Sequence, residues 1–248
     1  ETFWQPVKKL IDDKKEIFYS PDGVLVRINP LSLYDPEVKK PLADQLSINT
    51  LVSSSIIAAD NKTKQAEVSE ATLVGNIRAT AKLASEVLAE TNELLLKNRI
   101  KTTLKEGITT ADNKFTKGIL YLDKPVKTRL PENSDTTTWT AYKIREMLLD
   151  SVSLVIFRAA DENIVEDDSG EQLSALQKAF TISGADYQLV ELWRTEPQIS
   201  RLFFEVFYKE LLRKNRPVKE AFSRARKAIR KKAQTPEQWS SFVLISGG

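Results

Sequence analysis

A dense set of carboxylates lies in the polar loop expected from Arg158 to Gly170. Its members are Asp161, Glu162, Glu166, Asp167 and Asp168. Carboxylates at this density could hold a hard cation such as Ca²⁺ or Mg²⁺, because these ions prefer oxygen ligands. The spacing matches no known calcium loop, so we interpret the segment as a solvated loop and predict neither a metal site nor a cofactor.

Asp123 is a second acid that could take part in chemistry. It could act as a base toward the hydroxyl of Ser134 or Thr136, which follow it in a polar segment. Isolated Asp and Ser residues in such a segment usually form turns, and we favour that interpretation. The eight glycines of the chain form no phosphate-binding motif.

The two residue types that carry most nucleophilic and imidazole chemistry are absent. The 248 residues include no histidine and no cysteine. Thiolate nucleophiles, imidazole bases, disulfides and thiolate metal sites are therefore excluded.

A basic stretch covers residues 213–232, where Glu220 is the only acid. Its apolar residues recur at helical spacing: Val218, Ala221, Phe222, Ala225 and Ile229. This pattern predicts an amphipathic helix with its charges facing outward. The net charge of the whole chain is only +3, and we expect no nucleic-acid binding. A polyanion-binding module that uses Arg224, Lys227 and Lys231 stays open as an alternative.

Alternating strand and helix patterns surround these residues. Strands are expected at 16–19, 24–28, 46–52, 70–77, 118–122, 153–157, 188–193 and 239–245, and helices at 4–14, 79–97, 141–149, 173–180, 199–213 and 218–232. The first two strands flank Ser20-Pro21-Asp22-Gly23, a sequence typical of a tight turn. The run Ser153–Phe157 is apolar on both faces, as in parallel strands covered by helices. The order predicts an α/β domain with a largely parallel sheet.

Several short blocks resemble one known family. They are Gly184-Ala185-Asp186, Leu192-Trp193-Arg194-Thr195-Glu196-Pro197, Phe203-Phe204 with Phe207-Tyr208, Val218-Lys219-Glu220-Ala221-Phe222 and Trp239-Ser240-Ser241-Phe242-Val243. In this order they resemble the C-terminal half of CHAT domains, caspase-like modules that usually follow tetratricopeptide repeats. Phe3-Trp4-Gln5-Pro6 and Tyr19-Ser20-Pro21-Asp22-Gly23 look like the opening segments of the same family.

This resemblance implies a caspase-like three-layer sandwich, with a central mostly parallel β-sheet flanked by helices. We expect a single domain over residues 1–248, in which 1–116 form a framework and 117–248 the caspase-like core. The first residue is Glu1, which suggests a fragment of a longer, repeat-containing protein. No apolar run is long enough for a membrane helix, and we expect a cytoplasmic location without membrane association.

The resemblance also shows that the catalytic residues of active relatives are missing. In those relatives a strand ends in Thr-His-Gly, and here the matching strand continues into Asp123-Lys124-Pro125, which puts the histidine position at or beside Pro125. The nucleophile follows the next strand, and the segment Arg158–Glu162 puts the cysteine position at Ala160. Neither proline nor alanine can accept a proton or attack a carbonyl.

We therefore predict a pseudoprotease without enzyme activity that serves as a protein–protein interaction or regulatory module. Its binding groove would be rimmed by Asp123, Lys124, Arg158, Asp161 and Glu162. The expected partner is a protein or peptide, with an amino-terminal repeat domain of the same chain as one candidate. An active peptidase or hydrolase with an unrecognised nucleophile stays open as an alternative.

Overall fold

A single eight-stranded sheet forms the centre of the described chain, which in this computed structural model comprises residues 5–11, 13–55, 66–75, 86–105, 117–123, 140–158 and 170–247. In spatial order the strands are β1 (Glu16–Tyr19), β4 (Ser47–Leu51), β10 (Phe242–Ser246), β9 (Tyr187–Glu191), β8 (Val152–Arg158), β7 (Gly118–Leu122), β5 (Glu70–Val74) and β6 (Lys101–Lys105). Every neighbouring pair is parallel except β9 with β10. The predicted mostly parallel sheet is confirmed, and strands from both halves of the chain share it.

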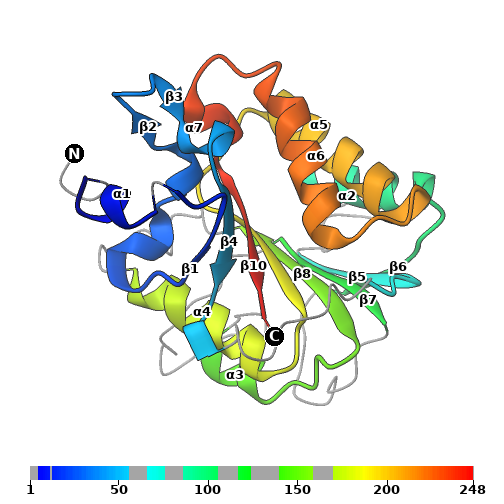
Figure 1. Cartoon of the computed structure of the whole chain (residues 1–248). Coiled ribbons are helices and arrows are strands. Elements are labelled where there is room, and N and C mark those ends of the chain that lie inside the picture. The colour runs from blue at the N-terminus through cyan, green and yellow to red at the C-terminus, as the bar shows by residue number, and fades with distance from the viewer. Residues whose placement is uncertain are drawn as a thin grey trace.

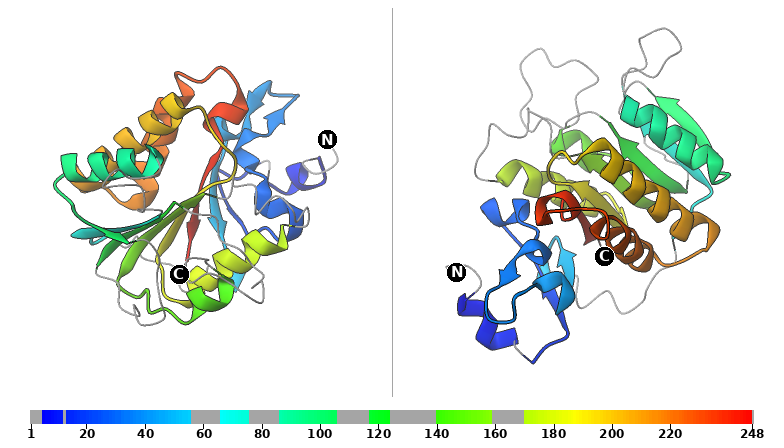
Figure 2. Two further views of the ribbon diagram at one scale, coloured as in Figure 1. Left: turned by 180° about the vertical axis from the view of Figure 1, so that it is seen from behind. Right: turned by 90° about the horizontal axis from the view of Figure 1, so that it is seen from above.

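Helices cover both faces of this sheet. On one face lie α2 (Glu86–Lys97), α5 (Pro197–Tyr208) and α6 (Val218–Arg230), and on the other lie α3 (Ala141–Arg145) and α4 (Glu171–Ile182), as Figures 1 and 2 show. The chain also forms α1 (Gln5–Ile11), α7 (Pro236–Trp239) and the small hairpin of β2 (Tyr34–Asp35) with β3 (Lys40–Pro41). These three layers confirm the caspase-like sandwich.

An aromatic cluster forms the core between α5, α6 and the sheet. The ring of Phe203 stacks on that of Phe242 with centroids 4.0 Å apart, and on that of Phe207 at 5.9 Å. Phe203, Phe207 and Tyr208 are fully buried, so the aromatic run of α5 belongs to the core. Aromatic pairs of this kind stabilise a core beyond their buried area.

The amino-terminal segment departs from the prediction. The strand at 16–19 forms as β1, but Gly23–Arg27 is a 3₁₀ helix, so the tight turn joins no hairpin. The reason is the contact with α4: the carboxylate of Asp22 accepts a hydrogen bond from Ser174, and Val26 packs into the core beneath that helix. A 3₁₀ turn buries Val26 against α4, whereas Val24 stays 55% exposed.

The edge strand β6 was not predicted from the sequence. Its sequence Lys-Thr-Thr-Leu-Lys has no apolar face, and most of its residues are exposed or half-buried. It forms because it extends the parallel sheet beyond β5, with Leu73 opposite Leu104 in register. Lysines at a sheet edge also discourage pairing with other chains.

Candidate functional site

Three charged residues lie side by side where three neighbouring strands end. In register, Leu122 of β7 pairs with Phe157 of β8, which places Asp123 beside Arg158, and Arg158 in turn pairs with Glu191 of β9. Parallel strands bring their carboxyl ends to the same edge of a sheet, where α/β proteins commonly bind ligands. With Gly75, which follows β5 next to Asp123, these residues form what we call the carboxyl-edge row.

The side chains of Asp123, Arg158 and Glu191 point to one face of the sheet. Side chains two residues apart on a strand share a face. Two residues before Asp123, Arg158 and Glu191 lie Tyr121, Ile156 and Leu189, which are buried with α2, α5 and α6. The row is therefore the outer continuation of the core beneath these helices.

Gly75 leaves free the space beside the Asp123 side chain, because it has no side chain of its own. A Cβ atom at position 75 would lie 3.1 Å from Asp123 Cβ and 2.8 Å from a methyl carbon of Leu88. The hydrogen bonding between β5 and β7 continues to this point, because the Asp123 amide donates to the carbonyl of Val74 at 2.9 Å. Any larger residue at position 75 would have to displace Asp123 or Leu88.

Glu191 connects three segments at this edge. Arg158 Nε lies 2.7 Å from Glu191 Oε2, and the amide of Thr195 donates to Glu191 Oε1 at 3.2 Å. The hydroxyl of Thr195 then donates to Ser241 Oγ at 2.6 Å, directly before β10. The Glu191 side chain is 3% exposed and that of Arg158 20% exposed, so this ion pair is largely shielded from water.

Burial shifts the pKa values of two groups around the row. Burial raises the pKa of the Glu191 carboxyl, although the charge of Arg158 opposes this shift. Burial, aided by the negative charge of Asp123, raises the pKa of the Tyr121 phenol, which therefore stays neutral. The row thus combines a fixed cation with acids in a region of low dielectric.

Arg158 and Gly170 are the described residues on either side of positions 159–169, and each is held by contacts. Arg158 is held by Glu191. Gly170 has a φ of +73°, and a Cβ there would lie 2.3 Å from the carbonyl oxygen of Gly23. The amino-terminal turn therefore packs against Gly170, the residue directly before α4.

The structure brings together two of the residues predicted to rim a groove, Asp123 and Arg158. The other three, Lys124, Asp161 and Glu162, lie outside the described residues, as do Pro125 and Ala160. Sequence reasoning missed Gly75 and Glu191. An acid at the end of the apolar run Tyr187–Glu191 was a signal that could have pointed to the latter.

The row contains no nucleophile paired with a base. Its described members offer two carboxylates, a guanidinium and a glycine, which can bind and orient charged groups but supply no thiol, imidazole or activated hydroxyl. Within the described ranges, no three acidic side chains lie close enough to hold a metal ion. The chemistry that this edge supports is charge recognition.

The basic helix α6 is partly neutralised by acids. Arg224 lies 2.9 Å from Glu220 and 3.6 Å from Glu210, so its charge is shared with two carboxylates. Arg230 forms a salt bridge with Asp44. These pairs weaken the outward positive potential that a polyanion-binding surface would need.

The fold and the carboxyl-edge row define a caspase-like α/β sandwich. Residues 107–247 match the CHAT domain family, and the chain belongs to it. No curated protein sequence matches the chain.

Fifteen solved chains are similar in structure. One is the Arg-specific cysteine proteinase gingipain R, with a TM-score of 0.55 at 10% sequence identity. The match covers 98% of this chain and 66% of the gingipain chain, so this chain spans about two thirds of that protein's length. At this identity the likeness shows the fold alone. Among the described helices, none has both the length and the apolar character that a membrane span requires.

Proposed function

We propose that this domain is a pseudoprotease of the CHAT family that binds a segment of a partner protein at the carboxyl-edge row without cleaving it. The observation that carries the proposal is a contrast. The chain has neither histidine nor cysteine, whereas the strand ends that would frame a caspase-like site are in register and held by a buried ion pair. Core packing and site chemistry depend on different residues, so a fold can keep its binding edge after its reaction is lost.

The charges of the row favour recognition of a polar, extended segment. The ion pair with Glu191 holds Arg158 through Nε, and the Arg158 side chain stays 20% exposed. A guanidinium fork binds a carboxylate or a backbone carbonyl well because its donors are planar and fixed. Asp123, at the next position along the edge, offers the opposite charge to a basic side chain of the same segment. We expect a partner segment that carries charges of both signs.

The test is a pull-down from the source cell with the full-length parent protein. The row variant would carry Asp123→Asn, which removes a charge and keeps the size of the side chain. The matched control would carry Glu70→Gln and Lys101→Gln, an ion pair at the opposite ends of β5 and β6. We expect the row variant to lose partners that both the wild type and the control retain.

Recovered partners would also be searched for new cleavage ends. We expect intact partners, because no thiol or imidazole is present. New ends that depend on the purified domain would show that an unrecognised nucleophile acts. If the row variant retained every partner, the proposal that the row is the binding site would be wrong.

A further inference from the structure

The strand β6 is the last strand at one edge of the sheet, and its outer side offers backbone groups to a further strand. Among the described strands it pairs with β5 alone, and Figure 1 shows it at the margin of the sheet next to α2. The Gly75 amide donates to the carbonyl of Lys105 at 3.0 Å, so the backbone groups of Lys105 face β5. Because these groups alternate along a strand, those of Thr102 and Leu104 face outward. Such an edge is a template for another extended segment.

Basic residues dominate this edge. The stretch 97–105 has four cations and no acid: Lys97, Arg99, Lys101 and Lys105. Lys97 and Arg99 are exposed and form no ion pair within the part of the chain that the structure describes. Arg213 adds a further cation, because its guanidinium donates to the carbonyl of Lys97 at 2.7 Å. The Lys101 side chain is 75% exposed and lies 3.5 Å from Glu70. The edge therefore attracts acidic groups.

The side chains of β6 form two different surfaces. Leu104 is in register with Leu73, which is buried beneath the helices, so Leu104 and Thr102 lie on the face that α2 covers. Leu104 is nevertheless 38% exposed there. Lys101, Thr103 and Lys105 alternate with these residues and point to the opposite face. A strand laid along β6 would meet lysines on one face and cover Leu104 on the other.

A second copy of this chain does not fit the edge. Two β6 strands paired antiparallel around Thr103 would place Lys101 of one copy opposite Lys105 of the other. Like charges directly opposite each other destabilise a strand pair. Because residues 97–105 include no acid, no register within this stretch could pair the lysines with carboxylates.

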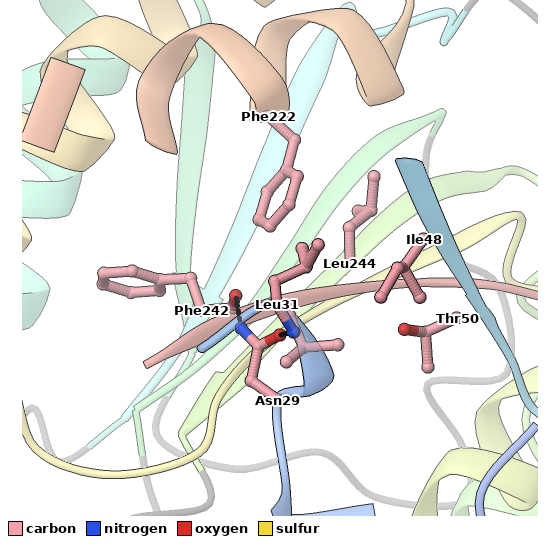
Figure 3. A pocket seen from close by; sticks show the side chains of 8 residues that line it. Asn29, Leu31, Ile48, Thr50, Phe222, Phe242 and Leu244 are labelled. Atoms are coloured by element: carbon pink, nitrogen blue, oxygen red, sulfur yellow. Dashed lines mark hydrogen bonds between the residues drawn. The ribbon is translucent and has the colours of Figure 1, made fainter. Parts of the chain in front are cut away.

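The chain itself fills the corresponding space near the other end of the sheet. Figure 3 shows Leu31 of the amino-terminal segment close to Phe222 of α6, Ile48 of β4 and Leu244 of β10. The crevice that these residues line has a free volume of about 10 Å³, which holds one water molecule at most. The outer side of β6 is therefore the better position for an added segment.

We propose that β6 binds an extended acidic segment of a partner protein as an additional strand of the sheet. Hydrogen bonds to the backbone of Thr102 and Leu104 would hold the segment, and its side chains would select it. Acids would lie beside Lys101 and Lys105, and an apolar residue beside Leu104. Read from Lys101 to Lys105, the segment would have the order acid, any residue, polar, apolar, acid. The surface shares no residue with the carboxyl-edge row, so the two proposals can fail independently.

The test is an NMR titration of the domain with the capped peptide Ser-Glu-Val-Thr-Val-Glu-Ser, whose sequence reads the same in both directions. We expect saturable shifts and slower hydrogen exchange at the amides of Thr102 and Leu104. A peptide with Gln in place of both Glu residues should bind about threefold more weakly or worse, because it lacks the cross-strand charge pairs. A peptide N-methylated at its three central residues keeps its charge but lacks their backbone donors, and should bind at least about tenfold more weakly.

A variant of the domain tests the backbone pairing directly. Thr102→Pro removes an outward N–H, which a sheet edge tolerates, and should weaken binding by about tenfold. Unchanged amide signals of β8 would show that its sheet is intact. Thr103→Ser, whose amide faces β5, and Asp123→Asn, in the carboxyl-edge row, should bind the peptide as the wild type does.

Four results would each overturn the proposal. Equal binding of the N-methylated peptide would show attraction by charge alone, and equal binding of the Gln peptide would show that the lysines select nothing. Unchanged binding by Thr102→Pro would place the peptide elsewhere. Shifts of the Thr102 and Leu104 amides with domain concentration, in the absence of peptide, would identify a second copy of the chain as the occupant.

Discussion

Loss of Glu191 should destabilise the domain more than any ordinary surface change. Glu191→Ala would leave the Nε–H of Arg158 and the amide of Thr195 without their acceptor. Breaking a buried ion pair by removing one partner costs about 3–5 kcal/mol. Water can reach part of the Arg158 side chain, which is 20% exposed, so we expect the lower end, about 3 kcal/mol.

The opposite change, Arg158→Met, should make stability depend on pH. Burial already raises the pKa of Glu191, and removal of the opposing charge of Arg158 would raise it further. A carboxyl with a raised pKa in the folded state contributes stability that is complete below its ordinary pKa of 4.5 and is lost as the pH rises through the folded value. The loss of stability that Arg158→Met causes relative to the wild type should therefore be larger at pH 7 than at pH 4.5.

The double variant Arg158→Met with Glu191→Leu tests whether the two residues act as a pair. Replacing both charges by apolar groups removes the unpaired charge that each single variant leaves, so most of the stability should return. Urea unfolding of the four proteins would give the coupling energy, which we expect to be about 2 kcal/mol or more. Additive losses from the two single variants would refute the reasoning, because independent residues show no coupling.

Three further changes test the core, the backbone and the surface by urea or thermal unfolding. Phe203→Ala should destabilise the domain by about 3–5 kcal/mol, because it empties the centre of the aromatic cluster; a loss below about 1 kcal/mol would contradict that role. Gly118→Ala should cost at least about 1–3 kcal/mol, since φ is +147° and a Cβ would lie 1.9 Å from the Glu70 carbonyl oxygen; unchanged stability would show that the strand can shift. Arg230 lowers the pKa of Asp44, so this carboxylate contributes stability that is present above pH 3.8 and is lost as the pH falls through the lower folded value. Asp44→Asn should therefore be less stable than the wild type at pH 6 and approach it below pH 3, and parallel pH profiles of the two proteins would contradict this.

Local sequence patterns predicted the second half of the fold well. The strand β8 is apolar on both faces, and α5 and α6 carry regular apolar stripes, so each element could be predicted from its own residues. The elements that the patterns missed depend on distant partners. The strand β6 has no apolar face of its own and exists because β5 offers it an edge, and Gly23–Arg27 becomes a 3₁₀ helix because α4 lies beside it.

The candidate site was predictable only in part, for the same reason. Asp123 and Arg158 follow apolar strands, and that position marked them in the sequence. The role of Glu191 depends on the register of β8 with β9, and the role of Gly75 depends on the space that Asp123 needs. Neither register nor clearance between strands is visible in a single sequence.

The lack of histidine and cysteine does not affect the contacts that hold the carboxyl-edge row. No described group of the carboxyl-edge row contributes to the aromatic cluster of Phe203, and that cluster holds α5 and α6 on the sheet without help from the edge. The edge instead depends on Arg158 and Glu191, whose ion pair needs no histidine or cysteine to form. Loss of the two reactive side chains would leave both sets of contacts intact. A buried charge pair that stabilises little compared with an apolar pair is expected to persist where its charge serves recognition, and this links the pair to the binding function that we propose.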